Sequence, residues 1–158
     1  MRLCLALFAL AAAVVTLPLR AAAWEAFPVG TGNGTGRGWA VAIDPATSDP
    51  IVGGDINDAG NHENLTVIRY SALTGAEVWR TSVVGGVTNA ILVDAAGDVV
   101  VAGSTNPQTF IVVKLAGATG AELWRFTSSP DGGAATAIAL DSQGNVVAVG
   151  PIAPPGGS

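Results

Sequence analysis

The sequence repeats itself, and this repetition limits the possible folds more than any other feature. Residues 67–80 recur as residues 112–125, 45 positions later, and Thr-Gly-Ala-Glu-x-Trp-Arg matches without a gap. A second type of segment precedes each copy and ends in Asp, at 39–44, 89–94 and 136–141. Each of these is followed by a β-branched run that ends in Gly, at 51–54, 99–103 and 146–150. Repetition of this kind indicates one structural module used several times.

Each unit predicts four short strands joined by tight turns. Strand one ends at the Asp, and strand two is the β-branched run. Strands three and four are expected at 65–70 and 76–80 in the first unit, and at 110–115 and 121–126 in the second. In the turns between strands one and two, the Asp94 and Asp141 side chains can cap the turn, and Gly97 and Gly144 can take the positive φ of a bulged hairpin.

Both faces of the predicted strands must be covered. The runs 99–101 and 111–113 are apolar at consecutive positions, which indicates burial on two sides. A period near 45 with four strands favours β-propeller blades, in which neighbouring blades cover both faces, over the main alternative, a parallel β-solenoid. The predicted fold class is all-β, with four-stranded antiparallel sheets in an incomplete ring of about two and a half blades.

The units divide the chain into six segments. These are a signal peptide at 1–23, a leading strand and Gly-rich connector at 24–38, blade 1 at 39–86, blade 2 at 87–133, a partial blade 3 at 134–150 and a Pro/Gly tail at 151–158. Arg2, the apolar stretch after it and the small residues 21–23 are typical of a cleaved secretory signal. The alternative, an uncleaved anchor, is disfavoured because the stretch is short and contains Pro18. The chain is therefore predicted to be secreted or periplasmic, with no membrane span after cleavage.

Charge and cysteine content narrow the function further. The chain has 12 acidic and 7 basic residues, and cleavage would leave 5 basic residues. A chain so poor in Lys and Arg is not expected to bind nucleic acid or anionic membranes. The single cysteine, Cys4, lies in the predicted signal, so the mature chain would contain no disulfide.

One loop breaks the symmetry of the repeat. Gly54 to Val67 spans 13 positions, whereas Gly103 to Val112 spans 9. The longer loop contains His62, the only histidine, and hard oxygen donors of the kind that calcium prefers. The candidate metal ligands are Asp55, Asn57, Asp58 and Glu63. The alternative is an ordinary solvated hairpin loop, and His62 alone supports neither a zinc site nor general-base catalysis.

The two copies of the Thr-Gly motif carry a resemblance to a known family. Thr74, Gly75 and Trp79, and in the second copy Thr119, Gly120 and Trp124, resemble the Thr-Gly-x-x-x-Trp docking motif of pyrroloquinoline-quinone-like β-propeller repeats, and also the generic repeats of exported bacterial propellers. The resemblance implies that each Trp lodges against the adjacent blade. The quinone-type repeat usually has Asp where Ser71 and Ala116 stand, which favours the generic repeat.

These observations predict a non-catalytic binding or scaffold module, as a fragment of a longer propeller, with a protein or glycan partner. No catalytic or cofactor-binding residue is predicted. The alternative is a fragment of a propeller oxidoreductase that uses pyrroloquinoline quinone with calcium. An open arc of blades leaves unpaired strand edges, so self-association or further blades are expected. The sequence does not name the ligand or the total number of blades.

Overall fold

The computed structural model describes residues 35–105, 109–128 and 132–152, and every regular element within them is a β-strand. The first sheet contains β1 (Gly36–Ile43), β2 (Pro50–Asn57), β3 (Glu63–Tyr70) and β4 (Glu77–Val84). The second sheet contains β5 (Gly86–Val93), β6 (Val99–Thr105), β7 (Thr109–Leu115) and β8 (Glu122–Thr127). A two-stranded sheet follows, formed by β9 (Ala137–Leu140) and β10 (Val146–Val149).

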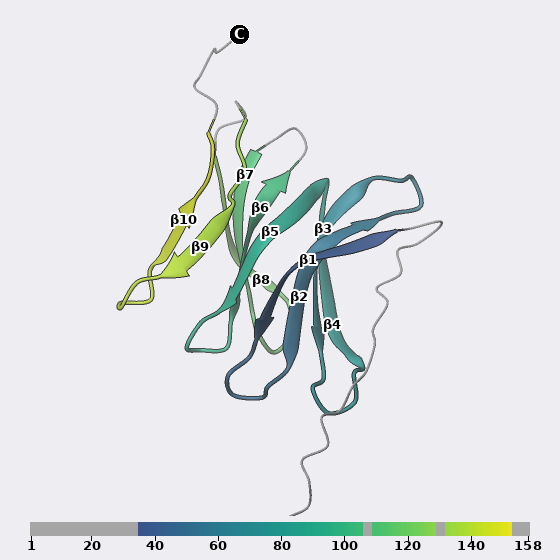
Figure 1. Cartoon of the computed structure of the whole chain (residues 1–158), viewed down its shortest axis with the longest axis vertical. Helices are drawn as coiled ribbons and strands as arrows, with labels where there is room; N and C mark the ends of the chain where they lie inside the picture. The colour runs from purple at the N-terminus through teal and green to yellow at the C-terminus, as the bar shows by residue number, and fades with distance from the viewer. Residues whose placement is uncertain (1–34, 106–108, 129–131, 153–158) are drawn as a thin grey trace, which may run out of the picture.

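All neighbouring strands are antiparallel and follow chain order. The prediction of an all-β fold with four-stranded antiparallel sheets is therefore confirmed. The described sheets do not close into a ring (Figure 1). The predicted signal at 1–23 lies outside the described residues, as do most of the predicted connector and tail. Within the described ranges, no helix is long and apolar enough to cross a membrane.

The strands lie close to their predicted positions, but several of them are longer than predicted. The first sheet begins at Gly36, before the predicted start at Trp39. Strand β4 continues past Arg80 to Val84, and all four added residues are paired with β3. The Thr66 and Ser82 hydroxyls are hydrogen-bonded across this extension at 2.9 Å.

The sheets are stacked face to face, and each first strand lies against the sheet before it. Strand β5 packs on β1, β2 and β3, and β9 packs on β5 and β6 (Figure 1). The apolar core between the first and second sheets contains Ile51, Leu65, Val67, Trp79, Val83, Val99, Val101, Ile111, Val113 and Leu115. A second core joins the second sheet to β9–β10 and contains Val100, Ala102, Phe110, Val112 and Ala135.

Strand β6 shows why both of its faces are apolar. Val99 and Val101 belong to the core shared with the first sheet, whereas Val100 and Ala102 belong to the core shared with β9–β10. All four side chains are fully buried. Because burying a Val side chain contributes about 1.5–3 kcal/mol, this strand stabilises two sheet contacts at once.

The predicted Asp caps and positive-φ glycines are confirmed in both of the turns for which they were predicted. The Asp94 carboxylate accepts the N–H groups of Ala96 and Asp98, and Gly97 has a φ of 83°. Asp141 accepts the N–H groups of residues 143 and 145 in the same way. The turn between β7 and β8 likewise has its glycine, Gly120, at a φ of 71°.

A bulge in each outer strand changes which side chains meet. In β4, Trp79 pairs with Arg69 and Glu77 pairs with Tyr70, so Val78 has no partner in the ladder. The extra residue shifts the alternation of side chains and brings Glu77 and Arg80 to the same side, 2.7 Å apart. Glu122 and Arg125 pair in the same way around Leu123 in β8.

The glycine that ends each β-branched run lies inside the second strand of its sheet and permits a close backbone approach. A Cβ at Gly54 would collide with the carbonyl oxygen of Arg37, and one at Gly103 would collide with that of Val87. Both carbonyls lie just before a register shift in the first strand of the sheet. The glycine repeats in the sequence because the bulge repeats in the structure.

Gly103→Ala is expected to lower the free energy of unfolding by about 3 kcal/mol, because the methyl group must displace the Val87 carbonyl. Urea unfolding followed by far-ultraviolet circular dichroism measures the change. Gly38→Ala is the matched control, since its Cβ would come no closer than 3.4 Å to Val52. Equal losses in the two variants would show that close packing at Gly103 is not the cause.

Candidate functional site

Trp79 joins the outer strand of the first sheet to the β7–β8 turn of the second. Its indole Nε1 donates a hydrogen bond to the Gly117 carbonyl oxygen at 2.8 Å, and the side chain is 8% exposed. Gly120 lies beneath the ring, where a Cβ would come 2.6 Å from the indole Cε3. The Thr81 hydroxyl donates to the Gly120 carbonyl at 2.6 Å. The turn at 116–121 is therefore held from the neighbouring sheet by both packing and hydrogen bonds.

A buried cluster around Arg69 reinforces the same contact. From β3, Arg69 donates to the Asp44 carboxylate at 2.7 Å and to Asp49 at 3.0 Å. Its third donor reaches the Gly117 carbonyl at 2.9 Å, so this oxygen accepts hydrogen bonds from both Trp79 and Arg69. Arg69 is 7% exposed. Its ion pairs are thus largely removed from solvent. In this environment of low polarity the opposite charges attract each other strongly.

The charges of this cluster are matched to their surroundings. The Ala46 N–H and the Arg69 guanidinium hold the pKa of Asp44 below its usual value. Burial alone would raise the pKa of Asp49, but the Ala72 N–H and Arg69 outweigh it and lower that pKa as well. Both acids are therefore charged in the folded protein at neutral pH.

The second sheet contains an equivalent but more exposed cluster. Lys114, at the repeat position of Arg69, pairs with Asp94 at 2.8 Å and with Asp98 at 3.2 Å. The hydrogen bond to Asp94 raises the pKa of Lys114. Sequence reasoning missed both clusters. The signal was present, because a basic residue stands two positions before Ser71 and before Ala116 in the two copies, and each unit has an Asp at the end of strand one.

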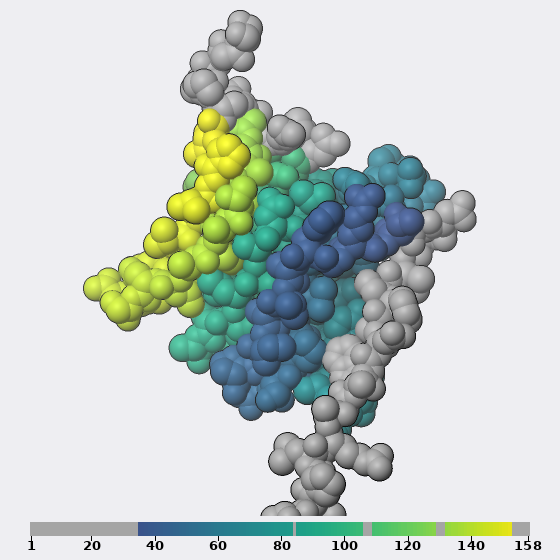
Figure 2. All heavy atoms as spheres, in the orientation of Figure 1, coloured from purple at the N-terminus to yellow at the C-terminus, as the bar shows by residue number. Residues whose placement is uncertain are grey.

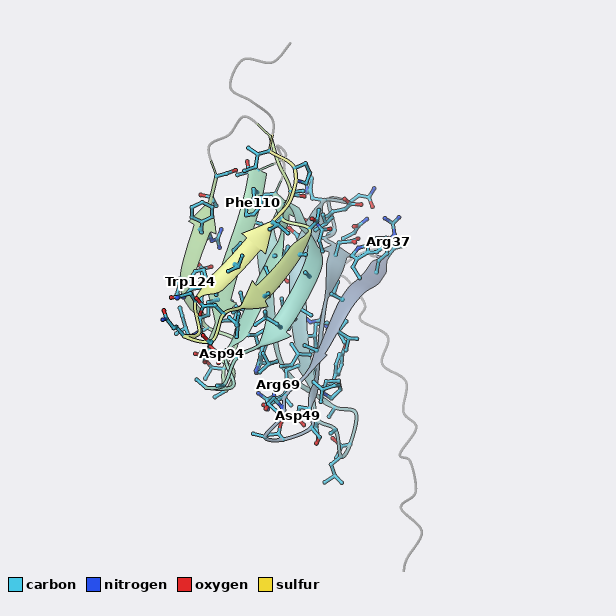
Figure 3. The ribbon with its side chains drawn as sticks, turned by 60° about the vertical axis from the view of Figure 1, so that its left-hand side comes forward. Arg37, Asp49, Arg69, Asp94, Phe110 and Trp124 are labelled. Atoms are coloured by element: carbon cyan, nitrogen blue, oxygen red, sulfur yellow. The ribbon has the colours of Figure 1, made fainter. Side chains whose placement is uncertain are left out.

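The second copy of the docking motif has a different environment. Trp124, at the position of Trp79, is 40% exposed and lies at the outer margin of the second sheet (Figure 3). Thr119 and Gly120 form the turn that Trp79 contacts. Thr74 and Gly75 form the corresponding turn of the first sheet, where Thr74 accepts the N–H of Ala76. The two tryptophans thus occupy the same position in the repeat but differ in burial.

Of the four candidate metal ligands, Asn57 and Glu63 are paired across β2 and β3, but the four side chains make different contacts. Asp55 is 2% exposed and accepts a hydrogen bond from the Trp39 indole. Asn57 donates to Asn61 at 3.1 Å, and the Glu63 carboxylate lies 3.7 Å from Arg37. No group of three His, Cys, Asp or Glu side chains that could hold a metal occurs in the ranges that the structure describes.

Asp58 organises the long loop instead. Its carboxylate accepts the N–H groups of Gly60 and His62 at 2.8 and 3.0 Å and lies 3.2 Å from the His62 ring. The His62 N–H is the main cause of the lowered pKa of Asp58. Counted from the equivalent glycines, β2 has three further paired residues after Gly54, whereas β6 has two after Gly103.

This loop borders a hollow between the ends of the first two sheets. The hollow has a volume of about 840 Å³. Its lining residues are Arg37, Asn57, Asn61, His62, Glu63, Gly85, Gly86, Val87, Ser104 and Thr105. Arg37 lies at the opposite end of the sheets from Arg69 and Asp49 (Figure 3). We refer to this surface as the loop-end hollow.

No protein-family model matches the chain, and no curated protein matches it. The assignment of a function therefore depends on the geometry described above.

Trp79→Ala is expected to lower the free energy of unfolding by about 3–5 kcal/mol, because it empties a buried site between two sheets. Trp79→Phe should cost about 1 kcal/mol, since Gly117 keeps its hydrogen bond from Arg69. Trp124→Ala, at an exposed position, is the matched control and should cost much less than Trp79→Ala. Urea unfolding measures all three variants. Similar losses for the two alanine variants would contradict the different burial of these tryptophans.

Arg69→Met is expected to destabilise the protein by about 3–5 kcal/mol at pH 7, because it leaves two acids without their cation. Asp44 and Asp49 have lowered pKa values in the fold, so their contribution is complete above the ordinary Asp pKa of 3.8 and is lost as the pH falls below it. The difference between wild type and Arg69→Met should therefore shrink between pH 7 and pH 3 in urea titrations.

Lys114→Met is the control for this prediction. Its ion pairs are more exposed, so the loss at pH 7 should be about 1 kcal/mol. A loss for Arg69→Met that is the same at pH 7 and pH 3 would show that the acids are not responsible for it.

Proposed function

We propose that the sheets are successive blades of a β-propeller-type repeat, similar to the Trp-docking repeats of exported bacterial proteins. Chain order supports this assignment, because β5 begins two residues after β4 ends and then packs on the first sheet. The contact between Trp79 and the Thr119-Gly120 turn supports it as well, since one repeat uses its Trp to hold the motif of the next. Fold does not determine function, which must be argued from a site.

The proposed function is a non-catalytic binding or scaffold module that acts outside the cytoplasm after removal of a signal at 1–23. The loop-end hollow is the observation on which this function depends. The four additional residues that distinguish the first unit from the second lie at the edge of this hollow. The two four-stranded sheets thus form a regular support, and the variable loop is at one end of it.

The chemistry of the hollow favours a polar partner. Its polar side chains remain accessible despite their contacts, with Arg37 at 60%, Glu63 at 50% and His62 at 71% exposure. Ser104 and Thr105 add hydroxyl groups from the second sheet. Donors and acceptors of this kind suit the hydroxyl groups of a glycan or the polar surface of a protein.

A photo-crosslinking amino acid at position 61 tests the proposed function. Full-length protein carrying it in the extracytoplasmic fraction should capture one partner, and competition with a glycan panel should identify a carbohydrate ligand. The crosslinker at position 73 is the control, because Leu73 is 87% exposed but lies outside the residues that line the hollow. A crosslinker at position 104, where Ser104 also lines the hollow, should capture the same partner, and this capture should disappear when residues 57–63 are replaced by Asn-Pro-Gln, the sequence at 106–108.

Two results would contradict the proposal. Equal capture from positions 61 and 73 would show that the hollow has no specific role. Reduction of a dye in the presence of pyrroloquinoline quinone, calcium and an alcohol or glucose would favour a propeller oxidoreductase instead.

A further inference from the structure

An apolar groove runs along the second sheet beside β10. It has a volume of about 490 Å³ and is lined mainly by the apolar side chains of β7, β8 and β10. Two of these, Trp124 and Phe126, are 40% and 56% exposed. The β9–β10 hairpin covers only the part of the second sheet nearest β5 and β6, and forms a margin of the molecule (Figure 2).

Three further features next to this groove lack the partner that their repeat equivalents have. The first is a strand edge. Strand β2 pairs with β3, and β6 pairs with β7, but β10 pairs only with β9 among the described strands. Its other edge offers backbone N–H and C=O groups to an additional strand.

The second feature is Trp124. Its equivalent, Trp79, is covered by the turn at 116–121, and its Nε1 donates to Gly117. Trp124 is five times more exposed than Trp79, at 40% against 8%. A turn equivalent to 116–121 would therefore cover Trp124 in the same way.

The third feature is the acid at the end of β9. Asp44 pairs with Arg69, and Asp94 pairs with Lys114, each cation coming from the third strand of its own sheet. Asp141 holds the same repeat position and accepts hydrogen bonds from its own turn, with Asn145 at 2.7 Å. Within the described part of the chain it has no ion-pair partner.

One element would supply all the missing partners. We propose that the groove and the free edge of β10 form a docking site for a β-hairpin of the repeat's own sequence class. Its first strand would pair with β10 and place alternate apolar side chains in the groove, as Ile111, Val113 and Leu115 do between the first two sheets. A basic residue at the position of Arg69 and Lys114 would pair with Asp141, and the Thr-Gly turn would cover Trp124.

This site is separate from the loop-end hollow, and its proposal does not depend on that surface having a ligand. The hairpin completes the two-stranded sheet to four strands and buries Trp124 and Phe126 of β8, which line the groove. The chemistry of the occupant is therefore specific. It requires an apolar alternation, then a cation, then a glycine that can adopt a positive φ beneath an indole ring.

A peptide copying residues 109–127 is the probe, added to the full-length protein and measured by isothermal titration calorimetry. It should bind with one-to-one stoichiometry, and hydrogen exchange should slow at the β10 amides that point away from β9. Trp124→Ala in the protein should weaken binding by about tenfold or more. Val41→Ala is the control, because Val41 is 64% exposed on β1 at the other end of the stack, and should not change binding.

Charge reversal tests the predicted ion pair. A peptide with Glu in place of Lys114 should bind wild-type protein more weakly than the unchanged peptide does. The Asp141→Lys protein should bind this Glu peptide more tightly than wild type does. Appending residues 109–127 after Ser158 provides a second measurement that avoids peptide solubility, and it should raise Tm by several degrees.

Three outcomes would overturn the proposal. Absence of binding together with an unchanged Tm of the extended chain would show that no hairpin docks. Equal binding to wild type and Trp124→Ala would place the peptide elsewhere. Protection of β10 by dimer formation of the chain alone would identify a second copy, and not a hairpin, as the occupant.

Discussion

The structure depends on the burial of sheets that are apolar on both faces. A four-stranded sheet with valines at consecutive positions cannot be stable with one face in water. The second sheet solves this problem by packing on the first sheet with one face and on β9–β10 with the other. Repetition along the chain follows from this constraint, because each unit provides the neighbour that the previous unit needs.

Hydrogen bonds to the Gly117 carbonyl fix how the first two sheets are placed relative to each other. Burial alone would allow two sheets to slide over each other, since the hydrophobic effect is not directional. The Gly117 carbonyl accepts from Trp79 and Arg69, and both donors come from the first sheet. Removal of either donor leaves the other, so the relative position of the sheets is fixed by a redundant polar contact inside an apolar one.

The sequence allowed prediction of features that depend on nearby residues. The strands, the Asp caps and the glycines with positive φ follow local rules and were found where they were expected. Partner choice over long distances was less accessible. Asp55 and Glu63 look like ligands of one ion in sequence, yet in the structure Asp55 accepts a hydrogen bond from Trp39 and Glu63 lies beside Arg37. The Arg69 cluster escaped notice because its acids lie in a different hairpin.

The central claim is that the indole of Trp79 packs on the β7–β8 turn and thereby joins consecutive sheets. The proton chemical shift of the Gly120 Hα atoms tests this most directly, because ring current from an overlying indole moves them upfield. The structure predicts a marked upfield shift of these protons and nuclear Overhauser contacts between Gly120 and the Trp79 ring. In Trp79→Phe the indole contacts should be lost, and the upfield shift should be reduced to the weaker effect of a phenyl ring. An ordinary glycine shift in the folded wild-type protein, without such contacts, would contradict the account.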